Sequence, residues 1–229
     1  MRRLDQILSS LGLGSRREVR AIIEGGRVTV HGEIVRQFDR KVEAVSVLVD
    51  GHPLEAPDGL LAMLHKPVGY VCTHAEGEGP TIYELLPGRW LRRNPPATSV
   101  GRLDKDTSGL ILITDRGDFV QKWTSPRATI EKVYEVEVDK PLSSGLIGLF
   151  AEGSIVLRGE EKPCLPAQLE ILDDHHARLT IAEGRYHQVR RMFASQGSHV
   201  AKLHRSRFGE FELGDLKPGE WRMLHAENP

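Results

Sequence analysis

Apolar positions near the start of the chain follow a helical period and then change to a strand period. In residues 4–11 the large apolar side chains recur at i, i+3, i+4 and i+7, which predicts a helix with one apolar face. Ser15 and Glu18 have the spacing of a capping box, which predicts a second helix that ends at Gly25-Gly26. Residues 27–35 alternate on both sides of His31-Gly32, as the strands of a β-hairpin do. We expect two short helices and a hairpin to form one small unit over residues 1–52.

Strand patterns dominate the rest of the chain. The segment 51–59 holds two Pro and two Gly and is predicted to be a linker. Short helices are expected near residues 81–86, 117–123 and 188–197. Apolar or alternating runs predict strands at residues 60–64, 110–113, 132–138, 168–172 and 177–182. Many strands and few helices predict an α+β domain over residues 60–229, built on a mixed, largely antiparallel sheet with flanking helices.

The apolar run 110–113 follows directly on a dense cluster of polar side chains, residues 101–109. Burying an ionised carboxylate is costly, so Asp104 and Asp106 must be solvated, hydrogen-bonded or paired with a cation. One interpretation is a turn whose Asp, Thr and Ser side chains bind backbone groups before the strand begins. The other interpretation is an active site, because charged side chains next to a core strand are costly unless they have a function. The stretch by itself favours the turn.

Composition narrows the class of protein. The chain has 229 residues and a formal net charge of −1, so a nucleic-acid partner has to meet basic residues gathered on one face. Cys72 and Cys164 are far apart, which predicts neither a disulfide framework nor a zinc site and suits a reducing compartment. The sequence has no apolar stretch of membrane-spanning length and no signal-peptide pattern, so we expect a soluble cytoplasmic protein with no membrane partner.

Basic residues gather in three places. Residues 1–41 hold nine Lys or Arg against five Asp or Glu, and Arg16, Arg17 and Arg20 lie around the start of the second helix. Cations gain nothing from a helix N-terminus, which favours a phosphate partner, although a solvated basic face explains the charge equally well. Three arginines between residues 89 and 93 predict an exposed basic loop over residues 87–99. Residues 183–208 hold six Lys or Arg against one acid, interleaved with Tyr and His rings, as single-stranded or flipped RNA requires.

The N-terminal unit resembles the S4 RNA-binding domain. The resemblance rests on Arg3-Leu4-Asp5, on Ser15-Arg16 and on the hairpin from Gly26 to Val35, and it covers about residues 2–50. The family usually has Asn-Gly or Asp-Gly at the hairpin turn, where this chain has His31-Gly32. An S4 domain implies two short helices and a hairpin that dock on structured RNA.

Three further blocks, in order along the chain, resemble the motifs of the RNA pseudouridine synthases that carry an N-terminal S4 domain. They are residues 101–110 around Asp104, Lys132-x-Tyr134, and Gly184-Arg185-x-His187-Gln188-Val189-Arg190. Ser125-Pro126-Arg127 and the run 186–194 are most similar to the members that act on the small ribosomal subunit. Large-subunit members tend to have Asn-Arg-Glu or Asn-Arg-Gln at positions 186–188. The resemblance implies isomerisation of a uridine to pseudouridine in 16S ribosomal RNA, the family site being uridine 516.

The resemblance also implies roles for single residues. Asp104 would be the catalytic carboxylate, Tyr134 would stack on the uracil, and Arg190 would pair with Asp104 and keep it ionised. Arg102 would fill the space that the flipped uridine leaves in the RNA. The other residues expected to bind RNA are Lys132, Arg185, Gln188, Arg191, Arg16, Arg17 and Arg20. The resemblance implies no cofactor and no metal. The expected partner is 16S ribosomal RNA or the assembling small ribosomal subunit, bound by a monomer.

Three alternatives stay open. A pseudouridine synthase that acts on large-subunit ribosomal RNA would carry the same three blocks. A non-catalytic RNA-binding or ribosome-assembly factor would explain the basic residues but gives Asp104 no role. Asp104-Lys105-Asp106-Thr107 also matches the D-x-D-x-T loop of haloacid-dehalogenase-type phosphatases. That fold requires an apolar strand directly before the first Asp and a parallel sheet.

Overall fold

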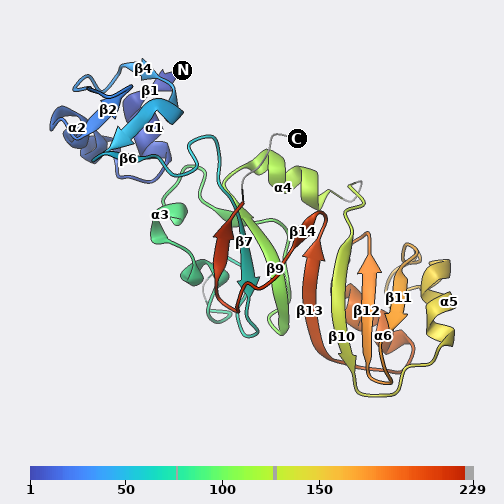
Figure 1. The fold of residues 1–229 in the computed structure, drawn as a ribbon. Helices are drawn as coiled ribbons and strands as arrows, with labels where there is room; N and C mark the ends of the chain where they lie inside the picture. Colours follow the sequence, from blue (N-terminus) through green and yellow to red (C-terminus); the bar gives the residue numbers. More distant parts are fainter. Residues whose placement is uncertain (76, 126–127, 225–229) are drawn as a thin grey trace.

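The computed structural model describes residues 1–75, 77–125 and 128–224, and its N-terminal part forms a distinct unit (Figure 1, blue). β1 pairs with β4, and the remaining strands of this unit form a sheet in the order β3-β2-β5-β6. Apolar side chains from both helices and from the sheet share one core. The elements are β1 (Arg2–Arg3), α1 (Leu4–Ser10), α2 (Arg16–Glu24), β2 (Val28–Val30), β3 (Glu33–Ile34), β4 (Lys41–Val42), the 3-10 turn η1 (Ala44–Ser46), β5 (Val47–Val49) and β6 (His52–Pro53).

The predicted capping box and hairpin are confirmed. The Glu18 N–H donates to Ser15 Oγ at 3.3 Å, and the Ser15 N–H donates to Glu18 Oε2 at 2.7 Å. At the hairpin turn, His31 has a φ of 51° and Gly32 a φ of 84°. A two-residue turn with two positive φ angles matches the twist of the flanking strands. His31 therefore adopts the left-handed conformation that Asn or Asp more often supplies at this position.

The larger unit is built on one mixed sheet with the strand order β11-β12-β10-β13-β9-β7-β15. Neighbours along this order are antiparallel, except that β13 and β9 are parallel. The predicted α+β class with a largely antiparallel sheet is thus confirmed. The elements are β7 (Leu61–Lys66), η2 (Ile82–Leu85), α3 (Gly88–Leu91), β8 (Thr98–Ser99), β9 (Thr107–Thr114), α4 (Gly117–Thr124), β10 (Lys132–Val138), α5 (Gly145–Glu152), β11 (Gln168–Ile171), β12 (His176–Ile181), α6 (Gln188–Ser195), β13 (Val200–Phe208), β14 (Phe211–Glu212) and β15 (Trp221–Met223).

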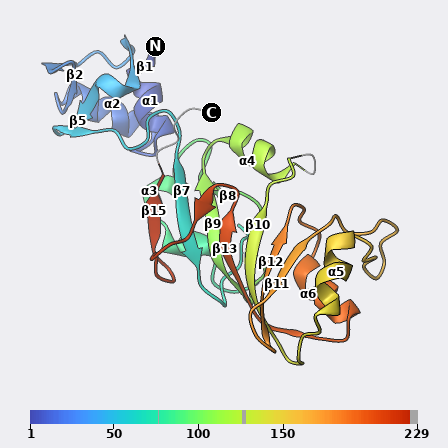
Figure 2. The ribbon, with the colours of Figure 1, turned by 45° about the vertical axis from the view of Figure 1, so that its right-hand side comes forward.

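Strand β9 is buried on both faces of this sheet. Ile111 and Ile113 belong to one apolar core, whereas Leu110 and Leu112 belong to a second core that includes side chains of α4. Because successive side chains of a strand point to opposite faces, a strand covered on both sides reads as a continuous apolar run. Helices α5 and α6 lie together beside β11 and β12, at the end of the sheet opposite β7 (Figures 1 and 2).

The prediction of an exposed basic loop over residues 87–99 is wrong for Arg93. Its side chain is 2% exposed and lies 2.6 Å from the Asp115 carboxylate. It also donates to the carbonyl oxygens of Glu55 and Ala56, at 3.1 and 2.6 Å. Arg89 turns back in the same way and lies 2.7 Å from the Glu55 carboxylate. The loop is basic in sequence, but folding brings acceptors from distant segments to two of its three arginines.

The segment 51–59 connects the two units and also forms strand pairing and hydrogen bonds with them. It begins with β6, which extends the N-terminal sheet, and it then supplies the Glu55 and Ala56 acceptors. A second connection is the Asn94 N–H, which donates to the Ser10 carbonyl oxygen at the end of α1 at 2.9 Å. The N-terminal unit therefore contacts the loop 89–94 directly through the Asn94–Ser10 hydrogen bond.

One predicted feature falls outside the described residues. Pro126 and Arg127 belong to the predicted helix break and to the Ser-Pro-Arg resemblance, and α4 ends at Thr124, shortly before them. Within the described ranges, no helix has both the length and the apolar character needed to cross a membrane.

Candidate active site

The loop that carries Asp104 connects β8 to β9 and is fixed by short-range contacts. The Thr107 N–H donates to the Asp104 carbonyl oxygen at 3.0 Å and closes a turn. Where the loop enters β9, Gly109 allows β13 to approach, because a Cβ at this position would collide with the Arg205 backbone. The Asp104 side chain remains 31% exposed. Its backbone is thus anchored to the sheet while its carboxylate stays accessible.

A buried lysine holds this loop from inside the protein. Lys66, at the end of β7, is fully buried, and its Nζ donates to the carbonyl oxygens of Thr107 at 2.6 Å, Pro67 at 3.0 Å and Lys105 at 3.3 Å. Three acceptors match the three N–H groups of an ammonium. Burial lowers the pKa of Lys66, and neighbouring acidic groups that include Asp104 oppose this shift. The charge of Lys66 therefore lies close to the carboxylates of the loop.

A cavity of about 550 Å³ opens beside the loop, within the size range of small-molecule sites. The three blocks that the sequence singled out meet around it, although they are far apart in the chain. Asp104 lines the cavity from the loop, Tyr134 from β10 and Gln188 from the start of α6. Tyr134 is 9% exposed, so its ring is largely covered by protein. The lining also includes the apolar side chains of Val100, Leu103, Leu165, Ile181, Val189, Leu203 and Phe208.

The prediction that Arg190 pairs with Asp104 is wrong. Arg190 Nη2 lies 2.9 Å from Asp106 Oδ2, and the guanidinium also donates to the carbonyl oxygens of Asp106 and Val200. Asp104 Oδ1 is instead 3.2 Å from His187 Nε2. The two carboxylates of the loop point in different directions: Asp104 lines the cavity, whereas Asp106 is 64% exposed outside it. Arg190 therefore holds the loop through Asp106, and His187 is the residue in contact with Asp104.

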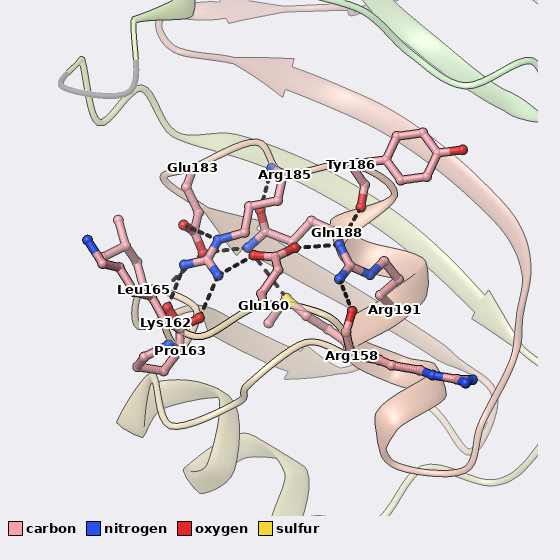
Figure 3. Close-up of polar contacts among 11 residues, drawn as sticks. Arg158, Glu160, Lys162, Pro163, Leu165, Glu183, Arg185, Tyr186, Gln188 and Arg191 are labelled. Carbon is pink, nitrogen blue, oxygen red and sulfur yellow. Dashed lines mark hydrogen bonds and ion pairs between the residues drawn. The ribbon is translucent and has the colours of Figure 1, made fainter.

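A network of ionic hydrogen bonds fixes the segment that carries His187 (Figure 3). Glu160 accepts from Arg191 at 2.6 Å and from Arg185 at 2.7 Å, and these two cations hold the pKa of its carboxyl below the usual range. The Gln188 side chain donates to Glu183 Oε1 at 2.6 Å and accepts from the Arg185 N–H at 2.9 Å. Arg185, Gln188 and Arg191 thus direct hydrogen bonds into the protein, and contacts of these three residues with RNA remain a prediction.

Other expected RNA-binding cations differ in their protein contacts. Arg16, Arg17 and Arg102 are exposed, and within the described part of the chain their side chains make no hydrogen bond or ion pair. Arg20 differs because it has a partner within the protein: its guanidinium lies 3.3 Å from the buried carboxylate of Asp5. The first three cations keep their hydrogen-bonding capacity for a partner, whereas Arg20 shares its capacity with the protein.

The cavity wall on β10 and β13 is positively charged. Burial and the neighbouring Arg205 lower the pKa of Lys132. Arg205 Nη2 and Thr107 Oγ1 are buried, and neither has a hydrogen-bond partner among the described residues. Unpartnered buried donors are unfavourable, so this wall suits a ligand rich in carbonyl or phosphate oxygens. As far as the chain is described, no three His, Cys, Asp or Glu side chains gather as a metal site would require.

Three residues of this site escaped the sequence reasoning: Lys66, His187 and Arg205. Lys66 lies at the end of an apolar run, where a charged residue reads as the end of a strand. His187 lies inside the third block, but nothing local indicates that it contacts a loop more than eighty residues earlier. Arg205 lies between the half-buried His204 and Ser206 on β13, and only the sheet register places it beside Tyr134.

Comparison with known proteins agrees with this geometry. The family described as "RNA pseudouridylate synthase" matches residues 61–195, and the S4 domain matches residues 2–44. "Ribosomal small subunit pseudouridine synthase A" of Pasteurella multocida (strain Pm70) is 42% identical over 98% of this chain and 97% of its own length. The protein of that name from Escherichia coli (strain K12) is 43% identical over 98% and 97%. A solved structure titled "Crystal structure of pseudouridylate synthase" has a TM-score of 0.67 and 38% identity, covering 98% of this chain and 96% of that one.

The chain therefore belongs to the RNA pseudouridine synthase family and carries an S4 domain at its N-terminal end. Both resemblances seen in the sequence are confirmed. The phosphatase alternative is wrong, because strand β9 follows Asp104 rather than preceding it and the sheet is largely antiparallel. The alternative of a non-catalytic RNA-binding factor gives way to an enzyme.

Proposed function

We propose that this protein converts a uridine of small-subunit ribosomal RNA to pseudouridine, and that the target is uridine 516 of 16S ribosomal RNA. The observation that carries the proposal is the position of Asp104 on the wall of a nucleotide-sized cavity that it shares with Tyr134. The substrate follows from relatives that are 42% and 43% identical over nearly the full chain and are named for the small subunit. Free 16S ribosomal RNA and the assembling subunit are both candidate substrates, and the cytoplasm is where such a monomeric enzyme would meet them.

The reaction rearranges atoms that the substrate already holds. The bond between uracil N1 and ribose C1′ breaks, the base turns, a bond forms between C5 and C1′, and the proton on C5 is lost while N1 gains one. A carboxylate assists either by attacking C1′ or by removing a ribose proton. Asp104 is the carboxylate in the cavity wall, and the buried ammonium of Lys66 holds the loop that presents it.

Tyr134 supports the reaction as a largely covered ring beside the carboxylate. A uracil inside the cavity would stack on this ring, which would restrict the base while it turns. Lys132 lies on β10 with Tyr134, and Arg205 lies on the neighbouring strand β13. Their positive charges can bind the carbonyl oxygens of uracil. Tyr134 therefore orients the base, while the two cations stabilise negative charge that develops on it.

The target uridine has to leave its RNA stack to reach the cavity, at a cost of a few kcal/mol. Arg102 is exposed at the cavity and has no side-chain partner among the described residues, so it is placed to fill the space that the base leaves. Arg16 and Arg17 of the S4 domain would hold the surrounding RNA through its phosphates. Arg190, Arg185, Gln188, Arg191 and Arg20 would act mainly by positioning the segments that meet the RNA.

The test is to incubate undermodified 16S ribosomal RNA, free and in assembling subunits, with wild-type protein and with Asp104→Asn, and to map pseudouridine along the RNA. Wild type is expected to modify uridine 516, and Asp104→Asn is expected to be slower by about 10⁴-fold or more, as for other reacting groups. Asp174→Asn, at an exposed carboxylate in the turn between β11 and β12, is the matched control and should keep most activity. A wild-type protein that modifies neither substrate would refute the proposal.

Two further outcomes separate the parts of the proposal. Pseudouridine found only in large-subunit ribosomal RNA, offered in a parallel reaction, would replace the small-subunit substrate by the large-subunit alternative. Full activity of Asp104→Asn would leave the substrate intact but remove the assignment of the carboxylate.

A further inference from the structure

Tyr186 presents a large aromatic ring to solvent next to the cavity. It is 77% exposed, and its ring points away from the polar network around Glu160 (Figure 3). The ring is stacked on His187, with 3.9 Å between ring centroids and 16° between ring planes. His187 lines the cavity and lies 3.2 Å from Asp104. One stack of rings therefore leads from the protein surface to the carboxylate.

The backbone beneath these two rings is held in an unfavourable conformation. His187 has a φ of 48°, in the left-handed region that residues other than glycine rarely adopt. Arg191 maintains this conformation: its Nη1 donates to the Tyr186 carbonyl oxygen at 3.0 Å, and its N–H donates to the His187 carbonyl oxygen at 3.0 Å. Glu160 in turn fixes the Arg191 guanidinium. Strain that several contacts maintain beside a cavity points to a use for the side chains it presents.

The surroundings of Tyr186 suit a nucleic-acid strand. One face of its ring is covered by the His187 imidazole, which leaves the outer face for a planar ligand. Exposed cations lie on neighbouring segments: Arg102 in the loop of Asp104, and Arg158, whose carbonyl oxygen accepts from Arg191. The side chains of Arg102 and Arg158 make no hydrogen bond or ion pair with other described residues. Flat rings flanked by free cations are what a single strand requires, since bases stack and phosphates are neutralised.

We propose that the outer face of Tyr186 stacks on an unpaired nucleobase of the substrate RNA, next to the flipped uridine. The proposal rests on the proposed function for the identity of the RNA, and it assigns the base beside the target to a site outside the cavity. The base, Tyr186 and His187 then form a continuous stack that ends at Asp104. Binding of the neighbouring nucleotide thereby restricts the residue that contacts the carboxylate.

The first test measures affinity for a 16S ribosomal RNA fragment that contains the target, by fluorescence anisotropy. Tyr186→Ala is compared with Tyr186→Phe, which keeps the ring, and with Leu172→Ala, a control at an exposed apolar residue in the distant β11–β12 turn. Loss of one base–ring stack is expected to weaken binding about 5- to 150-fold. Phe and the control are expected to bind within about twofold of wild type. Equal binding by Tyr186→Ala and wild type would overturn the proposal.

The second test locates the base. Fragments with a single abasic nucleotide at each unpaired position around the target are bound to wild type and to Tyr186→Ala. At one position the wild type should lose as much affinity as Tyr186→Ala does, and the variant should lose nothing further. Additive losses at every position would show that Tyr186 stacks on none of these bases.

Both tests are repeated with Asp104→Asn present, so that binding is measured without turnover. If wild type forms no pseudouridine while Tyr186→Ala still weakens binding, the proposed function fails and the stacking site stands. If pseudouridine forms and Tyr186→Ala binds like wild type, the stacking site fails alone.

Discussion

The loop 89–93 and the start of helix α2 both present arginines, and the two regions use them differently. In the loop, Arg93 is buried against Asp115, and Arg89 is paired with Glu55. At α2, Arg16 and Arg17 are exposed and make no hydrogen bond or ion pair with other described residues. The loop arginines hold the connecting segment 51–59 and Asp115, whereas Arg16 and Arg17 remain available for the RNA contacts proposed above. The number of cations therefore does not distinguish a basic segment that stabilises the protein from one that is available to bind RNA. The distinction depends on whether the arginines have acceptors within the protein.

The largest effect is expected for Arg93→Met, which tests whether the loop arginines stabilise the protein. Arg92→Met, at the exposed neighbouring residue, is the matched control. Loss of Arg93 leaves the Asp115 carboxylate and two backbone carbonyls without their donor, so the free energy of unfolding should fall by about 3–5 kcal/mol. The control should change it by less than about 0.5 kcal/mol. Urea unfolding measures both variants, and equal stabilities would show that the Arg93 contacts do not contribute.

Arg16→Ala combined with Arg17→Ala tests the other side of the comparison. RNA affinity should fall, and the slope of log K against log salt should become shallower by about 1.4–1.8, the effect of two lost phosphate contacts. Stability should stay within about 0.5 kcal/mol of wild type, because neither side chain has a described protein partner. Arg89→Ala, which removes one cation that is paired within the protein, is the control and should leave the slope unchanged. A salt slope equal to that of wild type in the double variant would contradict this account.

The smallest expected effect concerns Arg20, which lies on α2 but belongs with the structural arginines. Arg3, together with Arg20, holds the pKa of the buried Asp5 carboxyl below its usual range. The folded pKa lies below the unfolded value of about 3.9, so this stabilisation is present above that pH and disappears as pH falls through the folded pKa. Asp5→Asn should therefore reduce stability by on the order of 1 kcal/mol near neutral pH, and the deficit should shrink in acid. Urea unfolding between pH 7 and about 3 provides the measurement; a deficit independent of pH would refute the ionic explanation.

Most of the regular structure was predictable because its causes are local. The capping box of α2, the positive-φ hairpin turn, the alternation of β10 and the apolar run of β9 each follow from neighbouring side chains. Burial on both faces of β9 was also readable, since the run has no polar alternation. These elements fixed the class of fold before any contact between them was known.

The parts that could not be predicted depend on contacts between distant segments. No residue near Asp104 in the sequence indicates that its carboxylate contacts His187, or that Asp106 pairs with Arg190. The burial of Arg93 depends equally on Asp115, which lies on the far side of two strands in the sequence. Periodicity identifies which residues are charged or apolar, but the direction of a charged side chain in a loop is decided by tertiary packing.

The hydrogen bond between the S4 domain and the loop 89–94 has a consequence for the shape of the substrate. Asn94 is bonded to Ser10, and Arg93 to the segment that connects the two units, so these contacts favour one span between Arg16 and Asp104. A flexible tether would let one RNA contact be made after the other at any spacing. Under the proposed function, a set span would select RNA by its geometry: an RNA whose helix is lengthened by a few base pairs would present its phosphates at the wrong distance and rotation, even with its target uridine unchanged.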